Sequence, residues 1–231
     1  VLVALGGFGL AVVNADDLGD VREVGAVEFE EDIGTGQARL VISGTVGYAR
    51  VPVSDGDRGL HILDLVDPTA PRIAGYIPSP VAFAAPLGDR HVVLYNDYAH
   101  QLRVFDVSDP TQPVYIAGLG LSDVPNCMAS SGPYAYVVDR LGLHVIDYRD
   151  ITHPARVGST ITCVGYDVTV ADGHTYVAGD GLTVIDVRDP SSPRQVATVR
   201  DGAAFAARRV VAAAGLAIVA DWKRGVTAFD V

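Results

Sequence analysis

The residues with the most obvious catalytic potential in this chain are aspartates, but most of them recur at equivalent places. One set closes a series of similar apolar runs, at Asp64, Asp106, Asp147, Asp186 and Asp230. A second aspartate opens a turn a few residues later, with proline directly after it in three copies. Because a catalytic site needs one unusual group of side chains rather than several equal ones, these carboxylates indicate repeated structural turns.

A different set of polar residues precedes three of the repeats. Aligning each copy on the glycine turn after its first apolar run places Asn126, Asp167 and Arg209 in register, with Tyr166 and Arg208 one position earlier. These side chains could bind a small anionic or sugar-like ligand, or they could line a water-filled channel. A hydrolase or lyase would use these residues except Asn126, namely Asp167, Arg209, Tyr166 and Arg208.

The only tryptophan, Trp222, stands beside Lys223 and Arg224 in a loop between two apolar runs. Tyr98 and His100 lie in the equivalent loop of another copy. Tryptophan and arginine often carry the binding energy of protein interfaces, and variable loops on a repeated scaffold often carry function. Two interpretations stay open: Trp222 packs over a neighbouring repeat, or these five residues contact a protein or glycan partner.

Histidine and glycine patterns give no metal or cofactor signature. His61 and His144 occupy equivalent positions in separate repeats, and the sequence has no HExxH, no CxxC and no close cluster of histidine and aspartate. There is no GxSxG or Walker motif, and "GGFGLAVV" lacks GxGxxG spacing. We expect no cofactor and no metal. The alternative is a calcium ion in the loop "SDGDRG" (54–59), although this loop lacks the EF-hand ligand pattern.

The composition excludes several classes of function. The net charge of −11 argues against nucleic acid and anionic membrane surfaces as partners. No apolar run is long enough for a transmembrane helix, so we expect no membrane insertion. The two cysteines, Cys127 and Cys163, allow one disulfide or two buried thiols.

The chain repeats itself about every 40 residues, a period typical of propeller blades. The repeats are anchored at Leu10, Leu60, Leu102, Leu143, Leu182 and Val226. Each unit contains four short apolar runs separated by turn residues, which indicates four strands and almost no helix. We predict an all-β fold, a β-propeller of about six four-stranded blades, with a seven-bladed propeller as the alternative.

The turn between the third and fourth strands explains the repeated aspartates and prolines. Asp189 precedes Pro190, and its carboxylate can accept hydrogen bonds from backbone amides just ahead in the turn. Pro190 presets φ for the first corner, and Pro193 enters an edge strand where its missing N–H does no harm.

The segments "VFDVSDPTQP" (104–113) and "VIDVRDPSSP" (184–193) closely resemble the LVIVD repeat, a bacterial and archaeal β-propeller repeat. The resemblance covers nearly the whole chain and implies a propeller of a surface or secreted repeat protein, without a shared activity. The first copy departs from the pattern, because Asn14 replaces the usual aspartate and "DDLGDV" (16–21) replaces the turn with two prolines.

We expect one propeller domain over residues 1–231, with incomplete terminal blades: the first copy lacks an innermost strand and the last lacks an outermost strand. The favoured function is a non-catalytic scaffold that binds a protein or glycan through the variable loops of one face, which we call the top. The alternatives are assembly with neighbouring chains through the incomplete blades, and a hydrolase or lyase. An extracellular or cell-surface location is implied only by the resemblance.

Overall fold

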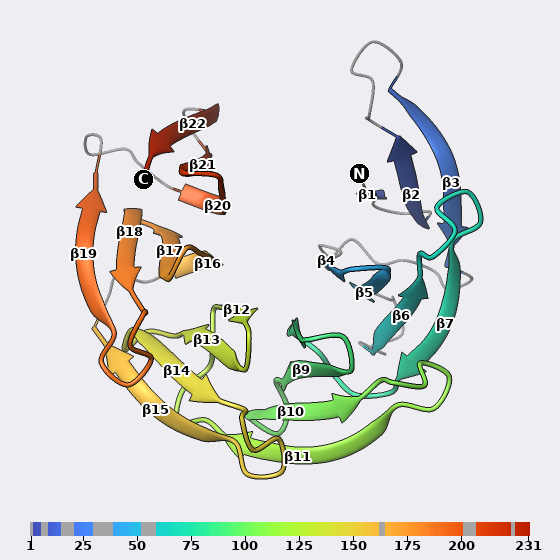
Figure 1. The fold of residues 1–231 in the computed structure, drawn as a ribbon, viewed down its shortest axis with the longest axis horizontal. Coiled ribbons are helices and arrows are strands. Elements are labelled where there is room, and N and C mark those ends of the chain that lie inside the picture. The colour runs from blue at the N-terminus through green and yellow to red at the C-terminus, as the bar shows by residue number, and fades with distance from the viewer. Residues whose placement is uncertain are drawn as a thin grey trace. The chain divides into compact units, whose positions relative to one another are not determined.

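The computed structural model describes residues 2–5, 9–14, 21–29, 39–51, 59–161, 165–200, 207–222 and 225–231. Every regular element in these segments is a β-strand (Figure 1). The prediction of almost no helix is therefore confirmed for the described part of the chain. Within it, no helix is long and apolar enough to cross a membrane.

The described strands form six sheets, and within each sheet the strands are neighbours in chain order. The first sheet contains β1 (Leu2–Leu5), β2 (Gly9–Asn14) and β3 (Arg22–Glu28), and the last contains β20 (Ala207–Ala213), β21 (Leu216–Asp221) and β22 (Gly225–Asp230). The four sheets between them have four strands each. In the described part of the chain the first and last sheets have three strands each, and incomplete terminal blades stay a prediction.

Each of the four-stranded sheets has the four short strands that were predicted for one repeat. The first two are β4 (Arg39–Ser43), β5 (Val46–Arg50), β6 (Leu60–Asp64) and β7 (Arg72–Ile77), then β8 (Phe83–Leu87), β9 (His91–Asn96), β10 (Gln101–Asp106) and β11 (Val114–Gly120). The next two are β12 (Cys127–Ser131), β13 (Tyr134–Val138), β14 (Leu143–Asp147) and β15 (Ala155–Thr160), then β16 (Gly165–Ala171), β17 (His174–Gly179), β18 (Gly181–Asp186) and β19 (Arg194–Val199).

The chain divides into two compact units. Unit 1 comprises residues 1–99 and 103–116, and unit 2 comprises residues 100–102 and 117–231. We describe each unit by itself, and a single propeller domain over residues 1–231 stays a prediction.

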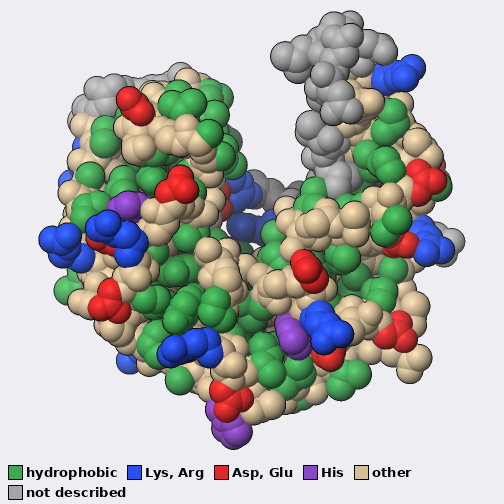
Figure 2. All heavy atoms as spheres, viewed as in Figure 1, with side chains coloured by type: hydrophobic (Ala, Val, Ile, Leu, Met, Phe, Trp, Pro, Cys, Tyr) green, Lys and Arg blue, Asp and Glu red, His purple; other side chains and the backbone are tan. Residues whose placement is uncertain are grey.

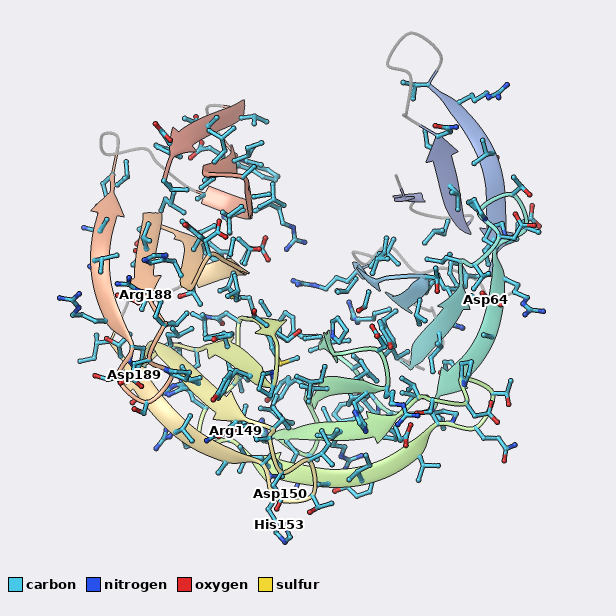
Figure 3. The ribbon with its side chains drawn as sticks, in the orientation of Figure 1. Asp64, Arg149, Asp150, His153, Arg188 and Asp189 are labelled. Carbon is cyan, nitrogen blue, oxygen red and sulfur yellow. The ribbon has the colours of Figure 1, made fainter. Side chains whose placement is uncertain are left out.

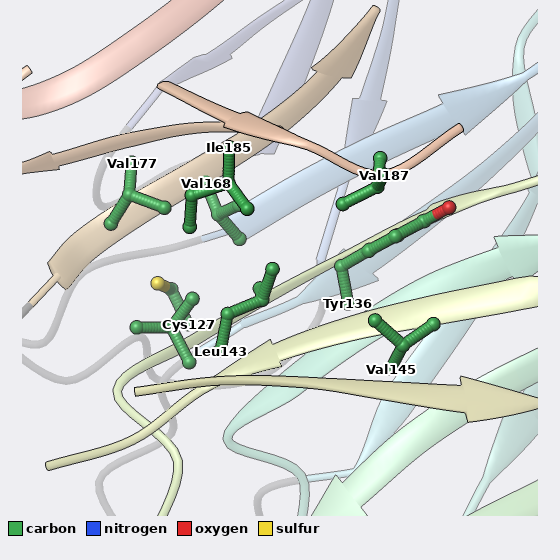
Figure 4. Close-up of a cluster of buried hydrophobic side chains, with 9 residues drawn as sticks. Cys127, Tyr136, Leu143, Val145, Val168, Val177, Ile185 and Val187 are labelled. Carbon is green, nitrogen blue, oxygen red and sulfur yellow. The ribbon is translucent and has the colours of Figure 1, made fainter. Parts of the chain in front are cut away.

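The core of unit 2 explains the period of two in the anchor strands. Leu143 and Val145 lie on one face of β14 and are fully buried. They pack against Val177 and Ile185 of the following sheet, together with Val168 and Val187 (Figure 4). Because successive side chains of a strand point to opposite faces, this alternation lets each sheet pack on a neighbour.

The predicted turns are confirmed in detail. The Asp189 carboxylate accepts hydrogen bonds from the Ser191 amide (3.0 Å) and hydroxyl (2.6 Å). The Ser192 amide donates to the backbone carbonyl of Asp189 at 3.1 Å. The same pattern occurs at the turns that begin at Asp67, Asp109 and Asp150. Figure 3 shows Asp150 and Asp189 in their turns.

A contact that the sequence analysis did not anticipate joins three of these turns, those that begin at Asp67, Asp109 and Asp189, to the preceding sheet. Gly158 in β15 lies directly under the Pro190 carbonyl, and a Cβ on that glycine would collide with it. In unit 1, Gly25 in β3 lies in the same way under Pro68, whose carbonyl oxygen is 2.5 Å from the Cβ position.

Candidate functional site

The candidate polar cluster of unit 2 lies where β16 and β20 begin. Asp167 pairs with Ala178 of β17, and Arg209 pairs with Ala220 of β21. In both strands the register shifts just before this pair, so that Tyr166 of β16 and its counterpart in β20 are extra residues. Such a bulge turns a side chain away from the regular ladder. The bulge residues of the two sheets are thus presented at equivalent places.

Two contacts link these strand starts. The guanidinium carbon of Arg208 lies 4.1 Å from the ring centroid of Tyr166, within the range of a cation–π interaction. The Asp167 carboxylate accepts a hydrogen bond from the Val210 amide at 3.0 Å, and its other oxygen lies 3.7 Å from an Arg209 nitrogen. Both carboxylate oxygens are therefore engaged with the neighbouring strand, which makes Asp167 a tie between two sheets.

The alignment that placed Asn126 in register with Asp167 and Arg209 is wrong by one residue. Cys127, not Asn126, pairs with Val138 in the way that Asp167 pairs with Ala178. The reason is the hairpin turn: its glycine is the first turn residue in β12–β13 but the second in β16–β17, so an alignment on glycine is displaced.

Asn126 is consequently equivalent to the bulge residue Tyr166 rather than to Asp167. Its backbone amide donates to the Val138 carbonyl at 2.7 Å. Its side-chain nitrogen is buried, and among the described residues no acceptor lies within hydrogen-bond reach of that nitrogen. The structure therefore brings together four of the five expected polar residues in direct contacts and leaves Asn126 outside those contacts.

Trp222 directly follows β21 at the same edge of the sheets. Its side chain is 79% exposed, so the interpretation in which it packs over a neighbouring repeat is wrong. Asp221, just before it, is buried and pairs with Ala207 at the start of β20. Trp222 thus projects from the strand end that the pairing of Asp221 with Ala207 anchors. Ala207 directly precedes Arg208 in β20. Lys223 and Arg224 lie outside the described residues.

Tyr98 and His100 occupy the turn between β9 and β10. Tyr98 belongs to unit 1 and is 68% exposed. His100 is also exposed, has a φ of 50°, and accepts a hydrogen bond on its carbonyl from the Leu121 amide at 2.9 Å. Their participation in the same binding surface as Trp222 stays a prediction.

Two histidines lie against aspartates, which the sequence analysis did not expect: exposed His153, whose Nδ1 lies 3.1 Å from an Asp150 carboxylate oxygen, and His144, which is nearly buried. His144 Nε2 lies 2.9 Å from a carboxylate oxygen of Asp139, and both side chains are nearly buried. The Asp139 carboxylate also accepts from the Leu141 and Gly142 amides. The short connection between β13 and β14 brings the two side chains together. The sequence contains this pair as an aspartate followed five residues later by a histidine, on either side of a predicted hairpin turn.

What can be said of a metal site holds for the described part of the chain only, and the disulfide alternative for Cys127 and Cys163 stays open. There, no three histidine, cysteine or acidic side chains gather closely enough to hold a metal ion. Most of "SDGDRG" and all of Cys163 lie outside the described residues. Cys127 is buried in the core of unit 2 (Figure 4).

Three of the repeated aspartates that close the anchor strands, Asp64, Asp147 and Asp186, bind arginine side chains. Asp147 binds Arg149 at 2.6 Å, and Asp186 binds Arg188 at 2.5 Å. Hydrogen bonds from these arginines hold the pKa of both carboxyls below the usual range. A base in catalysis needs a pKa near the working pH, so these carboxylates are poor candidates. On the face in Figure 2, acidic and basic side chains are interspersed rather than gathered in one basic patch.

Solved structures with the same fold cover almost the whole chain. A functionally unknown protein from Desulfotomaculum acetoxidans DSM 771 gives a TM-score of 0.76 at 11% identity, over 99% of this chain and 74% of that chain. BamB from Moraxella catarrhalis gives 0.61 at 15% identity, over 99% and 66%. A chain of the nidogen/laminin complex gives 0.64 at 11% identity, over 99% and 88%. A search of curated protein sequences finds no match.

The sheets and these likenesses define an all-β propeller protein with four-stranded antiparallel blades. Within that class, the LVIVD repeat matches residues 38–77, 128–162 and 165–201. This chain therefore carries LVIVD repeats, and the resemblance drawn from the sequence is confirmed. The expected number of about six blades, or seven, is not confirmed, because only four of the six described sheets have all four strands.

Proposed function

We propose that this chain is a non-catalytic propeller module that binds a protein partner through the top edge of unit 2. The observation that carries the proposal is the exposure of Trp222, at 79% of its side-chain surface, on a strand end that is itself anchored. A large aromatic ring held in water gains free energy when a partner covers it, and tryptophan is enriched among residues that dominate interfaces.

The neighbouring side chains support a binding surface of mixed character. Tyr166 is 38% exposed and its ring is covered on one side by the Arg208 guanidinium, which is exposed as well. The cation–π contact restricts both side chains before binding, so that less conformational entropy is lost when a partner arrives. Aromatic residues and arginine with such restricted side chains are favoured at the centres of interfaces.

The structural likeness to a chain solved in the nidogen/laminin complex is compatible with this function, because that structure is of a complex. At 11% identity the likeness carries the fold alone. Glycan binding, strand sharing at the terminal sheets and a cell-surface or secreted location stay predictions from the sequence. The hydrolase or lyase alternative gains no support, since the Asp167 carboxylate is occupied by Val210 and Arg209.

A site-specific photocrosslinker tests the proposal. We would replace Trp222 with benzoylphenylalanine and irradiate the protein in an extract of its native source. The control carries the same crosslinker at Val66, which is 71% exposed but lies beside an aspartate–proline turn. The proposal expects a discrete protein adduct from position 222 that is missing from position 66. Equal labelling from both positions, or no adduct from position 222, would refute it.

A further inference from the structure

A second candidate binding site lies in unit 1. A cavity of about 380 Å³ opens between the end of β7 and the outer strands of the next sheet. It is lined by Ile77, Pro78, Ser79, Arg103, Phe105 and Tyr115. The volume falls within the range of about 300–1,000 Å³ that is usual for small-molecule sites. The lining combines apolar walls with two polar groups, those of Ser79 and Arg103.

The polar end of the cavity presents hydrogen-bond donors. Ser79 is buried, and its hydroxyl oxygen accepts from Asn96 Nδ2 at 3.0 Å and faces an Arg103 nitrogen at 3.5 Å. The Asn96 carbonyl oxygen accepts from the Ala99 amide at 2.7 Å, which fixes the side-chain amide so that its nitrogen points to Ser79. With both contacts directed at its oxygen, the Ser79 hydroxyl proton is available to a ligand.

Arg103 carries a charge that the described residues do not neutralise. The side chain is half-buried, and none of the described carboxylates lies within ion-pair distance of its guanidinium. Arg72 in the same unit, by contrast, binds Asp64 at 2.6 Å. A half-buried guanidinium without a carboxylate favours an anion from outside the protein, because the charge is only partly hydrated there.

The equivalent place in the preceding repeat is filled by side chains. His61 of β6 takes the position of Arg103, and its ring lies 5.1 Å from Phe29 and 4.9 Å from Tyr76. Phe29 directly follows β3, just as Pro78 directly follows β7. The change from phenylalanine to proline therefore leaves room beside Arg103 that the preceding repeat lacks.

The later repeats also fill or satisfy this position. In unit 2 it is held by His144, which contacts Asp139, and by Thr183, whose hydroxyl lies 3.4 Å from that of Thr198. Of the four residues compared at this position, Arg103 is the one with a permanent positive charge, and it lines a cavity.

The apolar end of the cavity is aromatic. The rings of Phe105 and Tyr115 meet edge to face, with centroids 5.7 Å apart. Tyr115 is 52% exposed although it forms part of the wall. Such a pair offers an apolar surface to a flat ring, while Arg103 and Ser79 hold an anionic group a few ångströms away.

We propose that this cavity, lined by Arg103, Ser79, Phe105 and Tyr115, binds a carboxylate that is attached to an aromatic body. The guanidinium and the serine hydroxyl donate to the carboxylate oxygens, and the aromatic wall covers the ring of the ligand. This chemistry is shared by free aryl-alkanoic acids and by the C-terminal phenylalanine or tyrosine of a peptide.

The test measures binding of matched probes by calorimetry. The free-acid probes are 3-phenylpropanoate and its neutral amide, and the peptide-end probes are N-acetylphenylalanine and its C-terminal amide. We expect both acids to bind and each amide to bind at least tenfold more weakly. The tighter of the two acids identifies the source of the ligand, since only the peptide-end probe carries an acylated nitrogen.

The key variant is Arg103→Gln, which removes the charge and keeps much of the side-chain volume. It should weaken binding of the acids at least tenfold and leave amide binding unchanged. Tyr115→Ala should weaken acids and amides alike, because it removes the apolar wall. Arg156→Gln in β15 changes the net charge equally at an exposed site of unit 2 and should change nothing.

Three results would overturn the proposal: wild-type protein that binds neither acid, amides that bind as well as acids, or an Arg103→Gln variant that keeps the affinity of wild type. The melting temperature of each variant is recorded beside its affinity. A loss of binding by Arg103→Gln counts as support only where its melting curve matches that of Arg156→Gln. If Arg103→Gln does not fold, Arg103→Lys replaces it, and unchanged acid binding by that variant contradicts recognition by the planar guanidinium.

Discussion

Gly158 and Pro190 are in direct contact: the carbonyl oxygen of Pro190 occupies the space that a side chain on Gly158 would need. Pro190 belongs to the aspartate–proline turn, and Gly158 belongs to the outer strand of the preceding sheet. The same relationship joins Gly25 and Pro68 in unit 1. The turns that begin at Asp67, Asp109 and Asp189 therefore dock on the preceding sheet, and this close approach requires the glycine.

Replacement of Gly158 by alanine should destabilise unit 2. The new methyl group collides with backbone rather than with a flexible side chain, so the turn must move away from the sheet. Overpacking of this kind costs about 1–3 kcal/mol. Urea unfolding measures the loss.

Gly120→Ala is the matched control, because a Cβ on Gly120 in β11 would meet nothing within 4 Å. The control should be neutral or slightly stabilising, since alanine restricts the unfolded chain more than glycine does. Equal stability of the Gly158 and Gly120 variants would contradict the docking contact.

Leu143→Ala should be one of the most destabilising single changes in unit 2. Leu143 is fully buried between β14 and the following sheet, and loss of such a side chain leaves a cavity that costs about 2–5 kcal/mol. Val196→Ala in β19 removes a side chain that is 46% exposed and should cost much less. The midpoints of thermal unfolding compare the two variants directly. A Val196 variant as unstable as the Leu143 variant would refute the assignment of the core.

The turn carboxylates predict a loss of stability in acid. The pKa of Asp186 is lowered by hydrogen bonds from Arg188, and that of Asp189 by hydrogen bonds from Ser191. A carboxyl whose pKa is lower in the folded state stabilises the protein above its unfolded pKa of about 3.9, and this contribution disappears as the pH falls through the folded pKa. The melting temperature should therefore fall steadily as the pH drops below about 4.

Asp186→Asn isolates one of these groups, because asparagine does not titrate. The variant should melt below wild type at pH 6, and the difference should shrink as the pH is lowered from 4 to 2. A difference that stays constant over this range would show that the Asp186 charge does not contribute. The melting temperatures of both proteins at each pH supply the comparison.

Much of the fold could be predicted from the sequence, because each repeat combines alternating apolar strands with turn residues of fixed geometry. Asp189 is a clear case, since its hydrogen bonds follow from local chain geometry alone. The docking of Gly158 on Pro190 could not be predicted in this way. It depends on how closely two successive sheets pack, and local sequence preferences carry no information on the distance between sheets.

The candidate site was predictable only where local register decides it. Arg208 and Tyr166 were expected at equivalent strand starts, and the structure stacks them. Asn126 was misplaced because a glycine can take either position of a tight turn, which moves an alignment by one residue. The exposure of Trp222 depends on which neighbours cover it in three dimensions, and the loop sequence gives no information on that.

Binding through Trp222 is tested by comparing partner capture by immobilised wild-type protein with capture by a Trp222→Ala variant. The Val66→Ala variant is the control for an exposed apolar residue elsewhere. We expect a partner protein that wild type and the Val66 variant retain and that the Trp222 variant loses, with equal melting temperatures for all three. Undiminished capture of the same partner by the Trp222 variant would contradict binding through the top edge of unit 2.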